Sequence, residues 1–187
     1  AIERLSRAGY EVIGLDHFAL PTDALYRSLE DGTLHRNFMG YTTRAAPDMV
    51  AFGMSAISDL GGSFFQNAHH TREYEERIAG GERPVMRGLA RSAEDDLRRE
   101  TILSLMCRMR VDQDELERTT ERADLAEHFS VEWEELRTFA DEGLCELGPR
   151  RMRVHPAGRL FLRHMAMVFD QYLRRKQAAG PRFSQTV

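Results

Sequence analysis

Residues 9–25 read GYEVIGLDHFALPTDAL, an apolar run followed by a polar turn and the beginning of a helix. The apolar run from Glu11 to Leu15 predicts a short buried strand. Thr22 is the expected N-cap of the helix that follows, and Gly32 is expected to end that helix. A second apolar run, residues 49–57 (MVAFGMSAI), predicts another strand. Two buried strands with a helix between them favour a piece of an α/β sheet or barrel.

The predicted elements divide the chain into three regions. Two strands cannot form a stable parallel sheet alone, so residues 1–62 are expected to be the end of a larger barrel domain. Residues 63–90 include a helix followed by Gly80-Gly81 and are expected to be a connector. Residues 91–187 turn mainly helical, in the order helix, helix, hairpin, helix, which resembles a winged helix. The predicted fold class is therefore α/β plus mainly α.

Four local signals mark the helical region. Ser92 and Asp95 have the spacing of a capping box at the start of its first helix. Ser130 is the expected N-cap of the second helix. Residues 148–151 (GPRR) are expected to be the turn of a hairpin, and Pro156 fits the first position of a long final helix.

Charge is unevenly distributed along the helical region, although the whole chain carries only −4. Residues 91–147 contain eight basic and 17 acidic side chains, whereas the residues from Gly148 onward contain nine basic and one acidic. The second helix, residues 131–142, would be the recognition helix of a DNA-binding winged helix. Its net charge of −4 would repel phosphates, so no nucleic-acid partner is expected. Pairing between the two oppositely charged halves is the leading interpretation, and docking onto another domain is the alternative.

Composition narrows the class of protein further. The 187 residues contain no apolar run near the roughly 20 residues of a membrane span and no recognisable signal peptide, so a soluble cytoplasmic protein is expected. Cys107 and Cys145 are the two cysteines, which excludes a disulfide scaffold, a four-cysteine zinc site and a three-cysteine iron–sulfur site. Both thiols are expected to be buried and inert. The adjacent His69 and His70 would diverge on a helix, so no metal site is expected in this chain.

Polar and aromatic side chains gather near the predicted strands. Asp16 and His17 follow the first strand, and residues 34–44 (LHRNFMGYTTR) form an expected loop before the second. In an α/β barrel the residues after the strands build the active site. Arg36 has the guanidinium that clamps carboxylates, and His17 and Asp16 can transfer protons or orient polar groups. Turn formation and helix capping are the structural alternative for the same residues.

Several blocks of the sequence resemble oxygen-independent coproporphyrinogen III oxidase, a radical SAM enzyme family of haem synthesis. The DHFA and HRNF-x-GYTT patterns are its most specific features. The related haem-chaperone branch shares the glycine-rich strand but not HRNF-x-GYTT, which favours the oxidase. The similarity extends along the chain through GYEVIGLDHFALPTDAL (9–25), LHRNFMGYTTR (34–44), MVAFGMSAIS (49–58), RRETILSLMCRMRVD (98–112), GRLFLRHMAMVFDQYLR (158–174) and the tail at Arg182-Phe183-Ser184.

The resemblance implies a chemistry and a set of site residues. In the family, a [4Fe–4S] cluster cleaves S-adenosylmethionine, and the resulting radical converts two propionates of coproporphyrinogen III to vinyls, giving protoporphyrinogen IX. By match to the family's motifs, Ile57 is expected to touch one S-adenosylmethionine, and Phe38 and Met39 to line a second. Met39 stands where a glutamine is expected, and a thioether cannot donate a hydrogen bond. Substrate-pocket candidates beyond the motifs are Arg36, His17 and Asp16.

The family's cluster motif, CxxxCxxC, does not occur in this chain. The chain is therefore expected to be a C-terminal fragment of a partial (β/α) radical SAM barrel, followed by the winged-helix-like domain. Such a fragment would be inactive alone, would bind no cofactor tightly, and would need the N-terminal barrel portion as its partner. An exposed sheet edge also predicts self-association. The alternative function is a non-enzymatic, winged-helix-like protein-interaction module.

Overall fold

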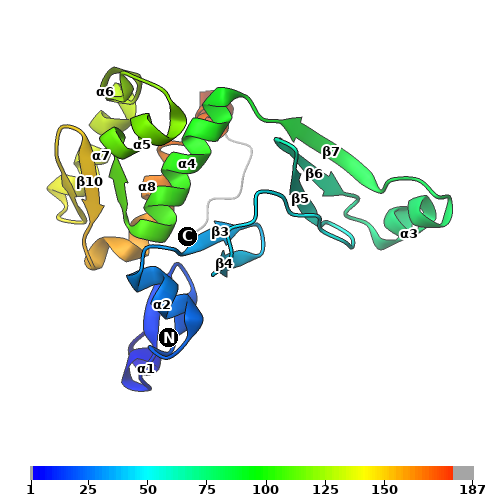
Figure 1. Cartoon of the computed structure of the whole chain (residues 1–187), viewed down its shortest axis with the longest axis horizontal. Helices are drawn as coiled ribbons and strands as arrows, with labels where there is room; N and C mark the ends of the chain where they lie inside the picture. The colour runs from blue at the N-terminus through cyan, green and yellow to red at the C-terminus, as the bar shows by residue number, and fades with distance from the viewer. Residues whose placement is uncertain (1, 179–187) are drawn as a thin grey trace.

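The computed structural model describes residues 2–178; residues 1 and 179–187, with the predicted block at Arg182-Phe183-Ser184, lie outside the described part. Figure 1 shows a mainly helical body, a small α/β segment at its base and a thin arm that projects from it. Every strand pairing among the described residues is antiparallel, and those strands form small sheets and no closed barrel. The strands expected to be the end of an α/β barrel thus pair, within the described residues, in small antiparallel sheets. None of the described helices is long and apolar enough to cross a membrane.

The base of the molecule is built from residues 2–42. Its elements are α1 (Ile2–Arg7), β1 (Glu11–Gly14), β2 (His17–Ala19), α2 (Ala24–Glu30), β3 (His35–Asn37) and β4 (Gly40–Thr42). The strand predicted at residues 11–15 is confirmed as β1, which pairs with β2. Asp23, not Thr22, caps α2, because its carboxylate accepts from the Leu25 amide at 2.8 Å. The expected loop at residues 34–44 is the β3–β4 hairpin.

The arm is a three-stranded sheet with a helix between its last two strands. It contains β5 (Ile57–Leu60), β6 (Ser63–Asn67), α3 (Thr71–Ala79) and β7 (Val85–Ala90), in the sheet order β5-β6-β7. The strand predicted at residues 49–57 is wrong: apart from a bridge between Met49 and Asp59, regular pairing begins at Ile57. Gly53 (φ +106°) and Ser55 (φ +62°) have left-handed backbone conformations, which interrupt an extended run.

The helical body contains the rest of the described chain. Its elements are α4 (Ala93–Arg108), β8 (Arg110–Asp112), α5 (Gln113–Thr120), α6 (Leu125–His128), α7 (Ser130–Asp141), β9 (Cys145–Leu147), β10 (Arg151–Val154), the 3-10 helix η1 (Ala157–Phe161), α8 (Leu162–Met167) and α9 (Gln171–Ala178). The capping box is confirmed, since Ser92 accepts from the Asp95 amide and Asp95 accepts from the Ser92 amide. The hairpin is confirmed as β9–β10, and β8 joins it to give the order β8-β10-β9.

Two helix predictions in this body are wrong. Phe129 is the N-cap of α7, and Ser130 is already helical, because α6 runs almost directly into α7. The long helix expected after Pro156 is divided into η1, α8 and α9. The last break occurs at Asp170, whose carboxylate accepts from the Tyr172 and Leu173 amides at 2.9 and 3.0 Å and so starts a new helix.

The core lies between α4, α7 and α8, and charge pairs surround it. Phe129, Leu136 and Phe169 are fully buried there. Arg150 pairs with Asp114 at 2.6 Å and with Glu117 at 2.7 Å. The expected pairing between the basic and acidic halves is therefore confirmed. Cys107 and Cys145 are both buried, as expected.

Candidate functional site

The first candidate residues meet where the two small hairpins of the base touch α4. Asp16 and His17 form the β1–β2 turn region, and their side chains are 2.9 Å apart, from Asp16 Oδ1 to His17 Nδ1. The His17 ring packs edge-on against Tyr41, with 5.1 Å between ring centroids. The Arg36 guanidinium lies over the same Tyr41 ring, 4.9 Å from its centroid. Tyr41 therefore brings the predicted residues Asp16, His17 and Arg36 into one cluster.

Tyr41 is held in place by α4. Its hydroxyl donates to the Met106 carbonyl at 3.0 Å, and this contact is buried. Carbonyls in the last turn of a helix have no partner within the helix, so Tyr41 satisfies one of these four orphan acceptors. Two glycines allow the close packing: a Cβ on Gly14 would collide with the Tyr41 hydroxyl, and a Cβ on Gly40 would lie 2.8 Å from His17 Nε2. Gly40 also has a φ of +126°, a backbone conformation that residues other than glycine rarely adopt.

The electrostatics of the cluster are dominated by burial. Burial raises the pKa of Tyr41 to about 12 and the pKa of Cys107 to about 11. The positive charge of Arg36 opposes both shifts. A backbone hydrogen bond, followed by the His17 contact, lowers the pKa of Asp16. Arg36 is half-buried, and its Nη1 atom is buried with no hydrogen-bond partner. A charged donor left without an acceptor favours an anionic ligand.

Phe38 and Met39 occupy the turn of the β3–β4 hairpin. Both side chains are exposed, Met39 to 84%. The Met39 amide donates to Asn37 Oδ1 at 2.8 Å, which fixes the turn. The Phe38 ring packs edge-on against Phe64 of β6, with 5.2 Å between centroids. The tip of the hairpin therefore reaches the arm.

Ile57 lies in the arm, on the same face of the sheet as Phe64. Side chains alternate between the two faces of a strand, and directly paired residues share a face. Ile57 is two residues from Asp59, and Asp59 pairs with Phe64. Phe38 packs against that face. The structure therefore turns Ile57 and Phe38 towards a common space.

A groove runs between the arm, the hairpin and the helical body. Its floor is one face of α4, formed by residues at helical spacing such as Arg99, Ile102 and Met106. One wall comes from the hairpin and the arm. The other comes from α8 and α9, where the sequence motifs place no site residue. The residues that line the groove on its three sides are Arg36, Asn37, Phe38, Asp59, Phe64, Leu89, Asp95, Arg98, Arg99, Ile102, Leu103, Met106, Arg163, Ala166, Met167, Phe169, Asp170, Gln171 and Tyr172.

The described residues do not suit a metal or an iron–sulfur cluster. No group of three or more His, Cys, Asp or Glu side chains between residues 2 and 178 could hold a metal ion. The two thiols are buried, and burial raises the pKa of each, which opposes the thiolate form that binds iron. The groove can bind carboxylates through its guanidinium groups. Its apolar and aromatic side chains can also stack against an apolar or aromatic ligand.

Comparisons of sequence and of structure relate this chain to the same kind of protein. The chain is 40% identical to oxygen-independent coproporphyrinogen III oxidase of Pseudomonas aeruginosa over 91% of this chain and 37% of that protein. It is 41% identical to the protein of the same name from Thermostichus vulcanus, over the whole chain and 57% of that protein. A solved structure, described as "Coproporphyrinogen III oxidase (HemN) from Escherichia coli is a Radical SAM enzyme", matches with a TM-score of 0.85 and 36% identity over 91% of this chain and 39% of that chain. No family model matches the chain.

The chain is thus homologous to oxygen-independent coproporphyrinogen III oxidase over part of that protein's length. It spans between 37% and 57% of the length of these relatives.

Proposed function

We propose that this chain forms the C-terminal part of an oxygen-independent coproporphyrinogen III oxidase, which converts two propionates of coproporphyrinogen III to vinyls. The observation that carries the proposal is the continuous similarity to these oxidases over 91% to 100% of the chain, in sequence and in structure. In such an enzyme, S-adenosylmethionine and a [4Fe–4S] cluster supply the one-electron chemistry. Because the described residues suit no cluster, the cluster ligands would come from the N-terminal barrel portion, and the present chain would be inactive alone.

The arm and the tip of the hairpin are the proposed wall for S-adenosylmethionine. Ile57 and the exposed Phe38 ring face a common space, which supports their roles as apolar contacts. Met39 is proposed to line the same wall with its backbone and thioether. Its backbone amide already donates to Asn37 Oδ1. Its side chain ends in a thioether, which cannot donate a hydrogen bond, so the contact available from the side chain is apolar.

The cluster around Tyr41 is the proposed end of the substrate pocket. Arg36, whose Nη1 lacks a partner, would bind a propionate of the substrate. His17 and Asp16 would orient the hairpin beside it, since His17 packs against the same ring as Arg36. The winged-helix-like body would cover the pocket and exclude water.

A chimeric enzyme tests this proposal. The part of the Escherichia coli oxidase that matches this chain is replaced by the 187 residues, and conversion of coproporphyrinogen III is measured without oxygen in the presence of S-adenosylmethionine. We expect two decarboxylations per substrate. A chimera that is folded, holds its full complement of cluster and forms no vinyl product would overturn the proposal.

An interaction module is the second candidate. Apart from the short α6, the order α4-β8-α5-α7-β9-β10 corresponds to the helix and strand order of winged helices. In this case the body would bind a protein partner and no chemistry would occur. The two candidates differ in one result: in the chimera, an interaction module would leave the oxidase inactive even with its cluster intact.

A further inference from the structure

We propose that Arg163 of α8 acts with Arg36 of β3 as a two-point clamp, which holds carboxylates at two edges of one apolar, macrocycle-sized ligand. The inference rests on the proposed function for the ligand's identity, but its physical basis is the groove itself. Arg36 and Arg163 both line this groove, although 126 residues separate them in the sequence. Arg36 belongs to β3 of the hairpin and Arg163 to α8, two different elements that line the groove beside α4.

The other charges in the groove are already paired. Arg98 contacts Glu132 at 2.9 Å and Glu94 at 2.6 Å. Arg99 contacts Asp59 at 3.1 Å, and Asp59 also pairs with Arg91.

The remaining acids have partners as well. Asp95 accepts from the Ser92 amide and hydroxyl and from Gln171, and Asp170 caps α9. By contrast, neither Arg36 nor Arg163 contacts a carboxylate anywhere in residues 2–178, the range that the structure describes. The charges in the groove that have no ion-pair partner among the described residues are therefore these two positive guanidinium groups.

Most of the remaining exposed lining of the groove is apolar. Phe38, Phe64 and Leu89 contribute from one side, and Met167 and Tyr172 from the other. Phe38 is about half exposed and Leu89 is 39% exposed, so apolar area remains available to a ligand. Two unpaired guanidinium groups on an apolar surface fit a ligand with a broad apolar body and carboxylates at separate edges. Free amino acids and nucleotides lack this combination.

The clamp also gives Arg163 a role in specificity. A ligand with carboxylates at both edges can satisfy both guanidinium groups, whereas a ligand with carboxylates at one edge can satisfy one of them. As decarboxylation removes carboxylates, the second contact is lost and the product is held less tightly than the substrate. Arg163 is thus a proposed substrate-binding and specificity-determining residue contributed by the helical body.

Porphyrin binding to the full 187-residue chain tests the clamp. The probes are coproporphyrin III, which has four propionates, and deuteroporphyrin IX, which has two, and binding is followed by fluorescence titration. For coproporphyrin III, we expect Arg36→Gln and Arg163→Gln each to raise Kd about tenfold, and the double variant to raise it further. For deuteroporphyrin IX, the double variant should lose no more affinity than the more affected single variant.

Arg159→Gln is the matched control, because Arg159 lies on η1, does not line the groove and has no carboxylate partner among the described residues. We expect it to change Kd less than about twofold. Equal losses for Arg159→Gln and Arg163→Gln would show general charge attraction and overturn the clamp. A second result would also overturn the clamp: a Kd for coproporphyrin III that neither Arg36→Gln nor Arg163→Gln changes, but that falls when residues 179–187 are deleted. That result would show that the chain's own C-terminal residues compete for the groove. Circular dichroism of each variant identifies any that fail to fold, and Arg163→Lys then serves as a second substitution that keeps the charge but loses the bidentate geometry.

The chimera separates failure of the clamp from failure of the proposed function. If the chimera is active and Arg163→Gln leaves its substrate KM unchanged, the clamp is wrong and the proposed function is supported. If the chimera is inactive with its cluster intact, while the 187-residue chain still binds coproporphyrin III through both arginines, the proposed function is wrong and the clamp is supported.

Discussion

At the scale of single residues, Tyr41 organises the candidate site. Its ring supports Arg36 on one side and His17 on another, and its hydroxyl reaches the end of α4. The sequence marks this tyrosine as one aromatic residue within a polar stretch. Its importance depends on the Met106 carbonyl, 65 residues away, and no local pattern reports such a contact.

Removal of the Tyr41 hydroxyl should destabilise the chain. Tyr41→Phe leaves the buried Met106 carbonyl without its donor, so we expect a loss of about 1–2 kcal/mol in the free energy of unfolding. Urea denaturation measures the change. Tyr10→Phe is the control, because the Tyr10 side chain makes no hydrogen bond within the described residues, and a similar loss there would contradict the role given to Tyr41.

The buried Tyr41 and Cys107 predict a loss of stability at alkaline pH. Burial raises the pKa of Cys107 from 9.0 to about 11 and that of Tyr41 from 10.0 to about 12. Both groups bind their protons more tightly in the folded state than in the unfolded state. Their contribution is complete below pH 9 and is lost as the pH rises through about 11 for Cys107 and about 12 for Tyr41. In the double variant Cys107→Ala, Tyr41→Phe, stability measured by urea denaturation should fall less steeply above pH 9 than in the parent chain; an unchanged slope would contradict the two shifts.

At the scale of secondary structure, the sequence predicts an element well where its signals are local. The Ser92–Asp95 capping box and the β9–β10 hairpin depend on neighbouring residues, and both predictions are confirmed. For the β3–β4 hairpin the sequence predicts only a loop, because each strand has three residues and the hairpin is stabilised by packing against α4 and β6. The break at Asp170 was missed because the apolar pattern continues through Phe169, which is buried, while the carboxylate starts a new helix.

Two serines allow a matched test of helix capping. Ser92 caps α4 in a reciprocal pair with Asp95, so Ser92→Ala should cost about 1 kcal/mol of stability. Ser130 has the same sequence signal but is an exposed helical residue, and Ser130→Ala should change stability by less than about 0.5 kcal/mol. Thermal unfolding compares the two. Equal losses would show that the assigned cap of α7 is incorrect.

One carboxylate joins the arm to the body through two ion pairs. Asp59 of β5 pairs with Arg91, just before α4, and with Arg99 within α4. The Asp59 side chain is 12% exposed, so its loss leaves two cations poorly compensated. Asp59→Asn should lower the local opening free energy of β5, β6 and β7 by about 2 kcal/mol. Hydrogen exchange should show faster exchange there, with α7 and β10 unchanged.

Glu76→Gln is the control for the arm, because the Glu76–Arg72 pair is exposed on both sides and contributes little. Faster exchange in the body as well as the arm after Asp59→Asn would contradict the local role of the carboxylate.

At the scale of the whole molecule, the site depends on three parts that the sequence alone does not place together. Side chains from the hairpin, the arm and the α8–α9 wall line one groove over α4. The resemblance to the oxidases implies Phe38, Met39 and Ile57 as residues of a site, whereas Arg36 is a candidate from the polar pattern near the predicted strands. Their roles remain predictions. Arg163 and Tyr172 could not be predicted because the helix expected after Pro156 was a continuous one, and the breaks at η1 and Asp170 determine which side chains face the groove.

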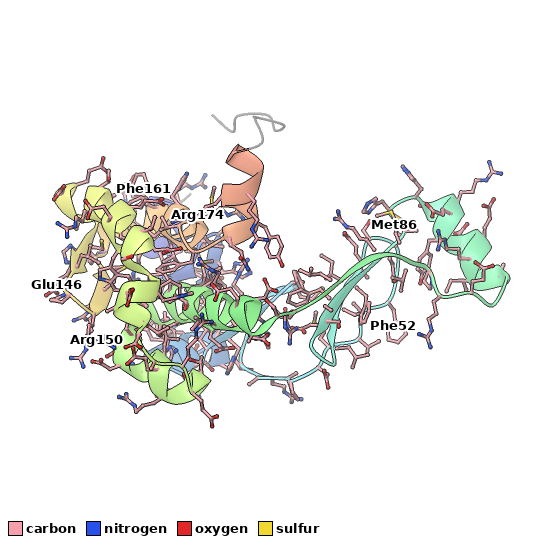
Figure 2. The ribbon with its side chains drawn as sticks, turned by 90° about the horizontal axis from the view of Figure 1, so that it is seen from above. Phe52, Met86, Glu146, Arg150, Phe161 and Arg174 are labelled. Carbon is pink, nitrogen blue, oxygen red and sulfur yellow. The ribbon has the colours of Figure 1, made fainter. Side chains whose placement is uncertain are left out.

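The arm also predicts self-association of the chain. β7 is an edge strand of the β5-β6-β7 sheet, and most of its residues are exposed. Figure 2 shows Met86 and Phe52 on the arm, away from the body, and they are 38% and 88% exposed. An open strand edge beside exposed apolar side chains favours pairing with a second copy. We therefore expect the sedimentation coefficient of the 187-residue chain to rise with concentration.

A charge placed on the edge strand distinguishes association through β7 from non-specific association. Met86→Lys places a cation on β7 and should suppress the concentration dependence, as charged edges do in natural sheets. Val131→Lys places the same charge at an exposed apolar position on α7 and should leave the dependence intact. If the parent chain stays monomeric at the highest concentration, the edge does not associate. If both substitutions suppress association equally, the added charge acts on the whole molecule and the β7 edge is not the contact.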